Sequence, residues 1–125
     1  MTDKKTILVI DDALEVRKLL KFHFEKKGYI VILEENGQEG LNKIKNMAVD
    51  LVILDLMLPG LAGEEVCRQI RKDEKIKNIP IIMITAQESD VKQIIGMVIG
   101  ADSYIIKPID ISEILKEVEK LIRKC

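Results

Sequence analysis

Short runs of apolar, mostly β-branched residues alternate along the chain with longer segments in which apolar residues recur every three or four positions. The short runs predict strands and the longer segments predict amphipathic helices. The predicted strands cover 6–10, 29–33, 50–55, 80–85 and 103–107. The predicted helices cover 14–27, 37–47, 63–73, 90–99 and 111–123. Because no repeat or internal linker interrupts this order, we expect residues 1–125 to form one domain.

Five strands that alternate with five helices indicate an α/β fold, with a parallel sheet covered by helices on both faces. The runs 6–10, 51–54 and 81–84 are almost continuously apolar, which is typical of strands buried on both faces. In an open parallel sheet, ligands bind beyond the carboxyl ends of the strands. The residues that follow each strand are therefore the first candidates for chemistry.

Two residue types that often carry chemistry are assigned structural roles by their spacing. His23, the single histidine, falls at helical spacing with Val16, Leu19 and Leu20, which predicts a place on the buried face of helix 14–27. Cys67 lies within a helical pattern and is predicted to be a small core residue. With Cys125 it has no metal-ligand spacing, so we expect a reduced, intracellular protein without a disulfide framework.

Polar side chains stand at the ends of four predicted strands. Asp11 and Asp12 follow the first strand, and Asp55 ends the third. Thr85 ends the fourth strand and Lys107 ends the fifth. Since the carboxyl ends of parallel strands meet at one edge of a sheet, we expect three carboxylates, a hydroxyl and an ammonium group to converge there.

The convergence of three carboxylates predicts a cation. Close carboxylates repel one another and tend to take up protons unless a cation joins them. Mg²⁺ suits such a site, because it prefers oxygen ligands, accepts one or two carboxylates directly and often shares a phosphate. A carboxylate such as Asp55 can also act as a nucleophile that forms an aspartyl phosphate. Thr85 and Lys107 would then contact the phosphoryl oxygens.

Four segments in order, VIDDALEVRKLL, DLVILDLMLPG, IIMITA and GADSYIIKP, resemble one known family. Over essentially its whole length the chain resembles the receiver domain of two-component response regulators, chemotaxis regulators included. The resemblance implies a flavodoxin-like, doubly wound (βα)5 fold in three layers. It also implies a five-stranded parallel sheet in the order 2-1-3-4-5.

The resemblance implies roles for the acidic residues. Asp55 matches the phosphoacceptor, and Asp11 and Asp12 match the acidic pair that binds Mg²⁺. Asp55 itself and the backbone carbonyl of Met57 would complete the metal site.

It also implies roles for residues on the last two strands. Thr85 and Lys107 match the phosphate-sensing residues. Tyr104 matches an aromatic switch, which would move between an exposed and a buried position as Thr85 shifts. The Lys107–Pro108 bond matches the usual cis peptide of the family. One departure is Ala62, which stands where an aspartate commonly precedes the glycine of this loop.

The resemblance further implies partners and an output. A sensor histidine kinase or a phosphotransfer protein would donate the phosphoryl group. The domain would be a signalling switch, not an enzyme, that assists its own phosphorylation and dephosphorylation. We expect segments 90–99, 103–107 and 111–123 to form its output surface, since Met97 adds apolar area to the first of them. The same surface is predicted to form a phosphorylation-dependent homodimer.

Other interpretations of the same residues remain open. A phosphohydrolase with an aspartyl nucleophile commonly carries a second aspartate two residues later, where this chain has Met57. A flavin-binding carrier would need a hydroxyl- and glycine-rich loop after the first strand, where this chain has the acidic DDALEV. In a purely structural interpretation, Asp11 or Asp12 caps the first helix and Lys107 is a solvated surface residue.

Composition restricts the setting further. The 125 residues include 20 Lys and Arg against 21 Asp and Glu, for a net charge of −1. This balance lacks the basic footprint of a nucleic-acid-binding domain. No run approaches the roughly 20 apolar residues of a membrane span. The run 6–10 is too short for the apolar region of a signal peptide, and two aspartates follow it. We therefore expect a cytoplasmic domain with no nucleic acid or membrane partner.

Overall fold

The computed structural model describes residues 4–86 and 100–123. Its strands are β1 (Thr6–Ile10), β2 (Ile30–Glu34), β3 (Leu51–Asp55), β4 (Ile81–Thr85) and β5 (Ser103–Ile106). Its helices are α1 (Leu14–Lys26), α2 (Gly37–Asn46), α3 (Gly63–Lys72) and α5 (Ile111–Arg123). These bounds match the predicted ones to within one residue. The predicted helix 90–99 lies outside the described residues.

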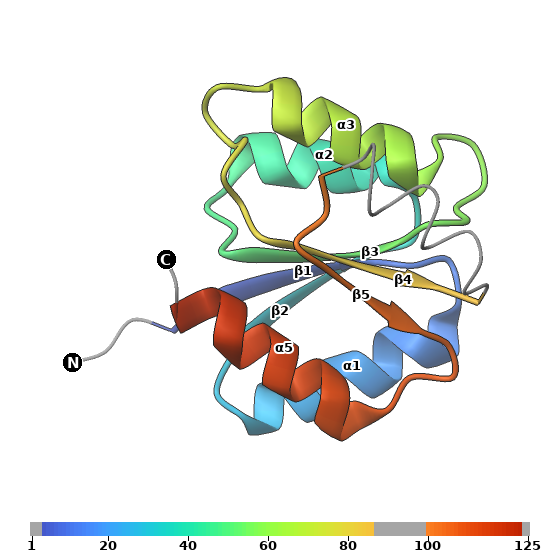
Figure 1. The fold of residues 1–125 in the computed structure, drawn as a ribbon, viewed down its shortest axis with the longest axis vertical. Helices are drawn as coiled ribbons and strands as arrows, with labels where there is room; N and C mark the ends of the chain where they lie inside the picture. The colour runs from blue at the N-terminus through green and yellow to red at the C-terminus, as the bar shows by residue number, and fades with distance from the viewer. Residues whose placement is uncertain (1–3, 87–99, 124–125) are drawn as a thin grey trace.

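The five strands form one sheet in the order β2-β1-β3-β4-β5, and every neighbouring pair is parallel. Figure 1 shows α2 and α3 on one face of this sheet and α1 and α5 on the other. The predicted three-layer, doubly wound fold and its strand order are confirmed. Because all strands point the same way, their carboxyl ends lie along a single edge, which is at the right in Figure 1.

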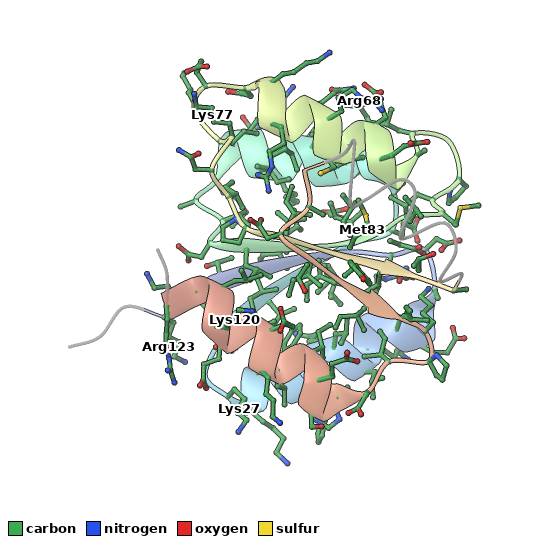
Figure 2. All side chains as sticks on the ribbon, viewed as in Figure 1. Lys27, Arg68, Lys77, Met83, Lys120 and Arg123 are labelled. Atoms are coloured by element: carbon green, nitrogen blue, oxygen red, sulfur yellow. The ribbon has the colours of Figure 1, made fainter. Side chains whose placement is uncertain are left out.

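The core is divided by the sheet into two apolar layers. Every residue of β1, β3 and β4 is buried, and successive side chains point to opposite faces. Leu8, Val52 and Met83 face α2 and α3, whereas Ile7 and Ile53 face α1 and α5. Figure 2, in which Met83 is labelled, shows side chains in the space between the sheet and its helices on both faces. Burial on both faces explains why the sequence of these strands is continuously apolar.

The buried face of α1 differs from the predicted one. Leu20 and Phe24 are fully buried, but Leu19 is 39% exposed and does not belong to this face. Val16 packs partly against the core one turn before Leu20, so the face follows positions 16, 20 and 24. His23 is partly buried on the flank of this face. Leu19 and Leu20 fit the helical spacing equally well, so the spacing alone does not show which of them is buried.

Cys67 is fully buried between the sheet and α2 and α3, so its prediction as a core residue is confirmed. Burial raises the pKa of its thiol from 9.0 to about 11, which keeps it protonated at neutral pH. None of the helices within 4–86 and 100–123 has the length and apolar character needed to cross a membrane.

Candidate functional site

The ends of β1 and β3, which are neighbours in the sheet, bring three carboxylates together. Asp11 and Asp12 directly follow β1, and Asp55 is the last residue of β3. One carboxylate oxygen of each residue lies within 4.8 Å of the other two. Asp11 and Asp55 are buried, whereas Asp12 is exposed. The strand ends therefore form an acidic cluster that is open to solvent on the side of Asp12.

Lys107 joins this cluster from the end of β5. Its Nζ atom lies 3.2 Å from Asp11 Oδ2 and 3.4 Å from Asp55 Oδ2. One ammonium group is thus shared between two buried carboxylates. The interpretation of Lys107 as a solvated surface residue is wrong.

Asp11 is held in place by hydrogen bonds to backbone groups of two neighbouring segments. Its backbone N–H donates to the carbonyl of Glu34 at 3.1 Å, and its Oδ1 accepts the N–H of Ala13 at 2.8 Å. The N-cap of α1 is Ala13, and no side chain caps this helix. The interpretation of Asp11 or Asp12 as a helix cap is therefore wrong, since the buried aspartate holds the loop before the helix.

Asp55 is positioned by the loop that follows β3. Its Oδ1 accepts the backbone N–H of Met57 at 3.0 Å, which leaves Oδ2 facing Lys107. Gly63 begins α3 so close to this strand end that an added Cβ would lie 2.1 Å from the Asp55 carbonyl oxygen. Only glycine permits α3 to start there. This requirement was not predicted, although Gly63 stands at the first position of the predicted helix 63–73.

Thr85 and Lys107 are coupled through the backbone. Thr85 is buried at the end of β4, and its carbonyl accepts the N–H of Lys107 at 2.7 Å. The peptide bond between Lys107 and Pro108 is cis. Tyr104 lies on β5 beside Met83 of β4 and is 41% exposed. The structure thus places Lys107 against the acidic cluster, Thr85 at the end of the neighbouring strand β4, and Tyr104 on the exposed part of β5.

The electrostatics of the cluster are unbalanced. Burial raises the pKa of Asp11, and the charge of Asp55 raises it further, against the lowering effect of the Ala13 N–H and of Lys107. Burial alone would lower the pKa of Lys107, but the charges of Asp55 and Asp11 outweigh it and raise that pKa. Among the described residues, the cluster of three carboxylates thus has one ammonium group, which pairs with Asp11 and Asp55.

The arrangement fits a hard divalent cation. Asp11 Oδ2 is buried and accepts no hydrogen bond of acceptable geometry from the described residues, although Lys107 Nζ is near. The donors around it are carboxylate oxygens, which are ligands that Mg²⁺ prefers. A bound cation would complete the coordination of this oxygen and reduce the repulsion among the three carboxylates.

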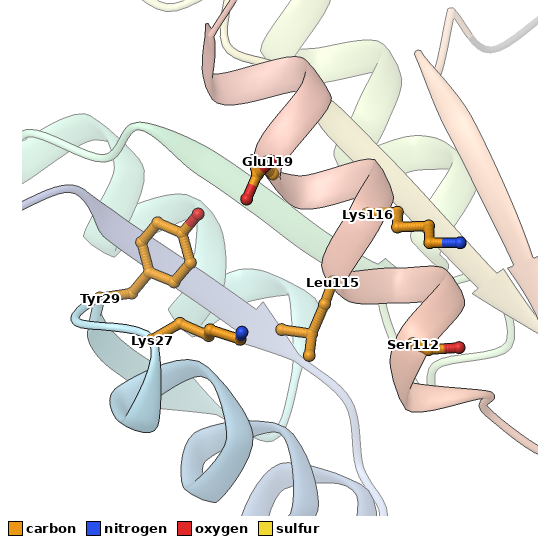
Figure 3. Close-up of a pocket in the computed structure, with 6 residues that line it drawn as sticks. All are labelled: Lys27, Tyr29, Ser112, Leu115, Lys116 and Glu119. Atoms are coloured by element: carbon orange, nitrogen blue, oxygen red, sulfur yellow. The ribbon is translucent and has the colours of Figure 1, made fainter.

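A separate hollow of about 300 Å³ lies between α5 and the segment that joins α1 to β2 (Figure 3). The hydroxyl of Tyr29 points toward Glu119 there, and burial together with the Glu119 charge raises the pKa of Tyr29. None of the predicted site residues lines this hollow. The candidate site is thus the open acidic cluster at the strand ends and not the more enclosed hollow.

The model of the response regulator receiver domain matches residues 7–119. The chain belongs to this family. Receiver domains are signalling switches that bind Mg²⁺ at an aspartate cluster and interact with histidine kinases or phosphotransfer proteins. The predicted family is therefore confirmed, and the chain is the receiver domain of a two-component response regulator.

Curated relatives of this receiver domain are longer proteins. It is 41% identical over 123 residues to the transcriptional regulatory protein ResD of Bacillus subtilis (strain 168), covering 98% of this chain and 50% of ResD. It is 38% identical over 120 residues to the alkaline phosphatase synthesis transcriptional regulatory protein PhoP of the same organism, covering 96% of this chain and 49% of PhoP. The receiver domain thus spans about half the length of these relatives.

Solved structures with the same fold include two receiver proteins. The response regulator TrrA of Thermotoga maritima, solved in complex with Mg²⁺ and BeF, matches with a TM-score of 0.84 at 38% identity, covering 94% of this chain and 98% of TrrA. The chemotaxis protein CheY4 of Vibrio cholerae matches with a TM-score of 0.88 at 27% identity, covering 95% of this chain and 99% of CheY4.

Proposed function

We propose that this receiver domain accepts a phosphoryl group on Asp55 from a sensor histidine kinase or a phosphotransfer protein, in a Mg²⁺-dependent reaction. The position of Asp55 Oδ2 carries the proposal. Asp55 is buried and belongs to the acidic cluster; its Oδ2 lies 3.4 Å from Lys107 Nζ, while its Oδ1 accepts the Met57 N–H. One oxygen is thus anchored and the other is directed at the incoming group.

The residues of the cluster divide the work. Asp11, Asp12, Asp55 and the carbonyl of Met57 would hold Mg²⁺, which neutralises phosphoryl charge when bound. Asp55 Oδ2 forms the bond to phosphorus while the bond from phosphorus to the histidine nitrogen of the donor breaks, and its electron pair stays on that nitrogen.

Lys107 and Thr85 stabilise the charge that the new phosphoryl group brings. The raised pKa of Lys107 keeps its ammonium group protonated at neutral pH, so it can contact a phosphoryl oxygen. The Thr85 hydroxyl would donate to another. The same groups would assist attack by water on the aspartyl phosphate, which returns Asp55 and inorganic phosphate. Met57 stands where a phosphohydrolase would carry its acid or base, and its side chain is 66% exposed. A thioether cannot act as a general acid or base, so this position supports a switch and not a hydrolase.

Phosphorylation would be transmitted to the output surface through β4 and β5. The hydrogen bond from Lys107 N–H to the Thr85 carbonyl joins the two strand ends, so a shift of Thr85 toward the phosphate moves both. Tyr104, three residues before Lys107 and 41% exposed, would turn inward as Thr85 shifts. The output surface of 90–99, β5 and α5 would then bind a downstream partner or a second copy of the domain.

Incubation with acetyl phosphate and Mg²⁺, followed by intact-mass spectrometry, tests the phosphoacceptor. We expect one base-labile phosphoryl group on the wild type, none on Asp55→Asn, and none without Mg²⁺. Asp50→Asn is the matched control, because it removes a carboxylate from the opposite end of the same strand, and it should be labelled normally. Full labelling of Asp55→Asn would contradict the proposal.

The dimer prediction has its own test. Sedimentation mass is measured with Mg²⁺ alone and with Mg²⁺ and beryllofluoride, a phosphoryl mimic. We expect the mass to double with the mimic for the wild type and to remain that of a monomer for Asp55→Asn. An unchanged wild-type mass would contradict the predicted homodimer. The output surface would then bind a different downstream protein.

A further inference from the structure

We propose that Arg17 is a positioning residue of the Mg²⁺ site, which it orders through the backbone of Asp11 without touching the metal. The inference rests on the proposed function for its metal, but it concerns a residue outside the acidic cluster. Arg17 lies in the first turns of α1, and its side chain is only 13% exposed. An arginine so near a metal site with three acidic residues would be expected to compete with the metal, so its contacts need an explanation.

The contacts of Arg17 join three segments around the site. Its Nη1 donates to the backbone carbonyl of Asp11 at 2.7 Å. Its Nη2 lies 3.8 Å from Oε2 of Glu35, in the loop between β2 and α2. The guanidinium group thus ties α1 to the end of β1 and to the neighbouring loop. It does so as a planar fork with separate donors, a geometry that a lysine cannot reproduce.

The contact with Arg17 completes the restraint of Asp11. The N–H of Asp11 is bound to Glu34, its Oδ1 to Ala13, and its carbonyl to Arg17. Of its four polar atoms, only Oδ2 has no hydrogen bond from the described residues, and this oxygen lies 3.2 Å from Lys107 Nζ beside the acidic cluster. Three fixed atoms therefore direct the fourth toward the metal position.

The Arg17 contact also reaches Asp12. The carbonyl that Arg17 holds belongs to the peptide unit between Asp11 and Asp12, and that unit is planar and rigid. When the carbonyl is anchored, rotation of this peptide plane is restricted, which limits the positions open to the backbone of Asp12 beside Asp11. Residues that orient metal ligands in this way typically change the affinity for the metal by about 10- to 100-fold when they are replaced.

Charge and positioning predict opposite results for removal of Arg17. If only its charge mattered, Arg17→Met would leave the cluster more negative and would tighten Mg²⁺ binding. If Arg17 positions Asp11 and Asp12, Arg17→Met would weaken Mg²⁺ binding despite the lost positive charge. The sign of the change therefore separates the two roles.

Calorimetric titration with Mg²⁺ alone tests the proposal. We expect about tenfold weaker binding for Arg17→Met and an intermediate loss for Arg17→Lys, which retains the charge and one donor. Lys21→Met is the matched control, since Lys21 lies on the same helix and pairs only with Glu25 among the described residues, at 2.9 Å. Its affinity should equal or slightly exceed that of the wild type. Arg17→Met binding as tightly as Lys21→Met overturns the proposal.

A second readout separates positioning from a merely structural role. Phosphoryl uptake from acetyl phosphate is measured across Mg²⁺ concentrations for folded Arg17→Met, or for Arg17→Lys if the former does not fold. We expect the rate to reach the wild-type value at saturating Mg²⁺, with only the half-saturating concentration raised. A rate deficit that persists at saturation overturns the proposal.

Failure of the proposed function gives a different pattern. Wild-type protein that binds Mg²⁺ but takes up no phosphoryl group contradicts the phosphoacceptor role of Asp55 and leaves the Mg²⁺ titration of Arg17→Met valid. Wild-type protein that is labelled on Asp55, with unchanged Mg²⁺ affinity in Arg17→Met, contradicts only the positioning role.

Discussion

The two edges of the sheet carry similar charged residues in opposite electrostatic situations. At the amino edge, Asp50 Oδ2 accepts the N–H of Thr6 at 2.8 Å, and Asp102 Oδ2 accepts the N–H of Ile81 at 2.8 Å. Each carboxylate thus holds the first residue of a neighbouring strand. At the carboxyl edge, Asp11 Oδ2 is buried and accepts no backbone N–H from the described residues. Its neighbour is the shared ammonium group of Lys107 at 3.2 Å.

The cations differ in the same way. Arg71, near the amino edge, donates from Nε to the carbonyl of Gly100, from Nη1 to the carbonyls of Lys77 and Ile79, and from Nη2 to Asp102. Each of these contacts measures 2.7–2.9 Å, and together they bind α3 to the segments before β4 and β5. Lys107, at the carboxyl edge, divides one ammonium group between two carboxylates at 3.2 and 3.4 Å.

This difference shows which charges stabilise the fold and which serve chemistry. The charges of the amino edge are matched to donors and acceptors of the protein itself, so they contribute to stability. The carboxyl edge keeps excess negative charge that the protein does not neutralise, which costs stability and leaves a place for a cation and a phosphoryl group. Replacements of Arg71, Lys107 and Asp50 test this difference.

Replacement of Arg71 should have the largest effect on stability. Arg71→Met keeps most of the side-chain volume but leaves partly buried carbonyls of Lys77 and Ile79 without this donor. We expect the free energy of unfolding in urea to fall by about 3 kcal/mol, with normal phosphoryl uptake by the folded fraction. Arg68→Met is the control on the same helix, because Arg68 pairs only with Glu65 among the described residues. A loss of similar size in both variants would assign the effect to the helix and not to the contacts of Arg71.

Replacement of Lys107 should give a smaller loss that depends on pH. Lys107→Met leaves the carboxylates without their ammonium partner, and we expect the free energy of unfolding without Mg²⁺ to fall by about 2 kcal/mol at neutral pH. The pKa of Lys107 is raised above 10.5 in the folded protein, so its contribution is complete below pH 10.5 and is lost as the pH rises through the folded pKa. The difference between wild type and Lys107→Met in urea should therefore shrink only above pH 10.5. A difference that already disappears near neutral pH would contradict this assignment.

Replacement of Asp50 should have the smallest effect and should depend on the substituent. Asp50→Ala removes the acceptor for the Thr6 N–H, and we expect a loss of about 1 kcal/mol in the free energy of unfolding. Asp50→Asn keeps a side-chain oxygen that can accept the same hydrogen bond, so its loss should be clearly smaller. Equal losses in the two variants would mean that the charge of Asp50, and not its hydrogen bond, stabilises the amino edge.

The fold was predictable because its interior strands are buried on both faces. Continuous apolar runs define β1, β3 and β4, and parallel topology then places Asp11, Asp55 and Lys107 at one edge without any knowledge of side-chain contacts. The burial of Leu20 instead of Leu19 was not predictable, because helical spacing alone allows either residue to face the core.

The division of roles within the site was less accessible from the sequence. Asp11 and Asp12 are identical residues in adjacent positions, yet one is buried and held by three contacts and the other is exposed. Arg17 and Arg71 were not identified at all. Most of their acceptors are backbone carbonyls, which every residue possesses, so no pattern of residue types reveals the partner.

Urea unfolding of Asp55→Asn and Asp102→Asn, each with and without Mg²⁺, tests the difference between the two edges most directly. Without Mg²⁺, we expect Asp55→Asn to raise the free energy of unfolding, because it removes one of three repelling charges, and Asp102→Asn to lower it, because Arg71 loses its charged partner. Mg²⁺ should stabilise the wild type and Asp102→Asn by mass action but not Asp55→Asn. If Asp55→Asn is destabilised without Mg²⁺ and gains as much from Mg²⁺ as the wild type, the excess charge at the carboxyl edge is not the basis of the site.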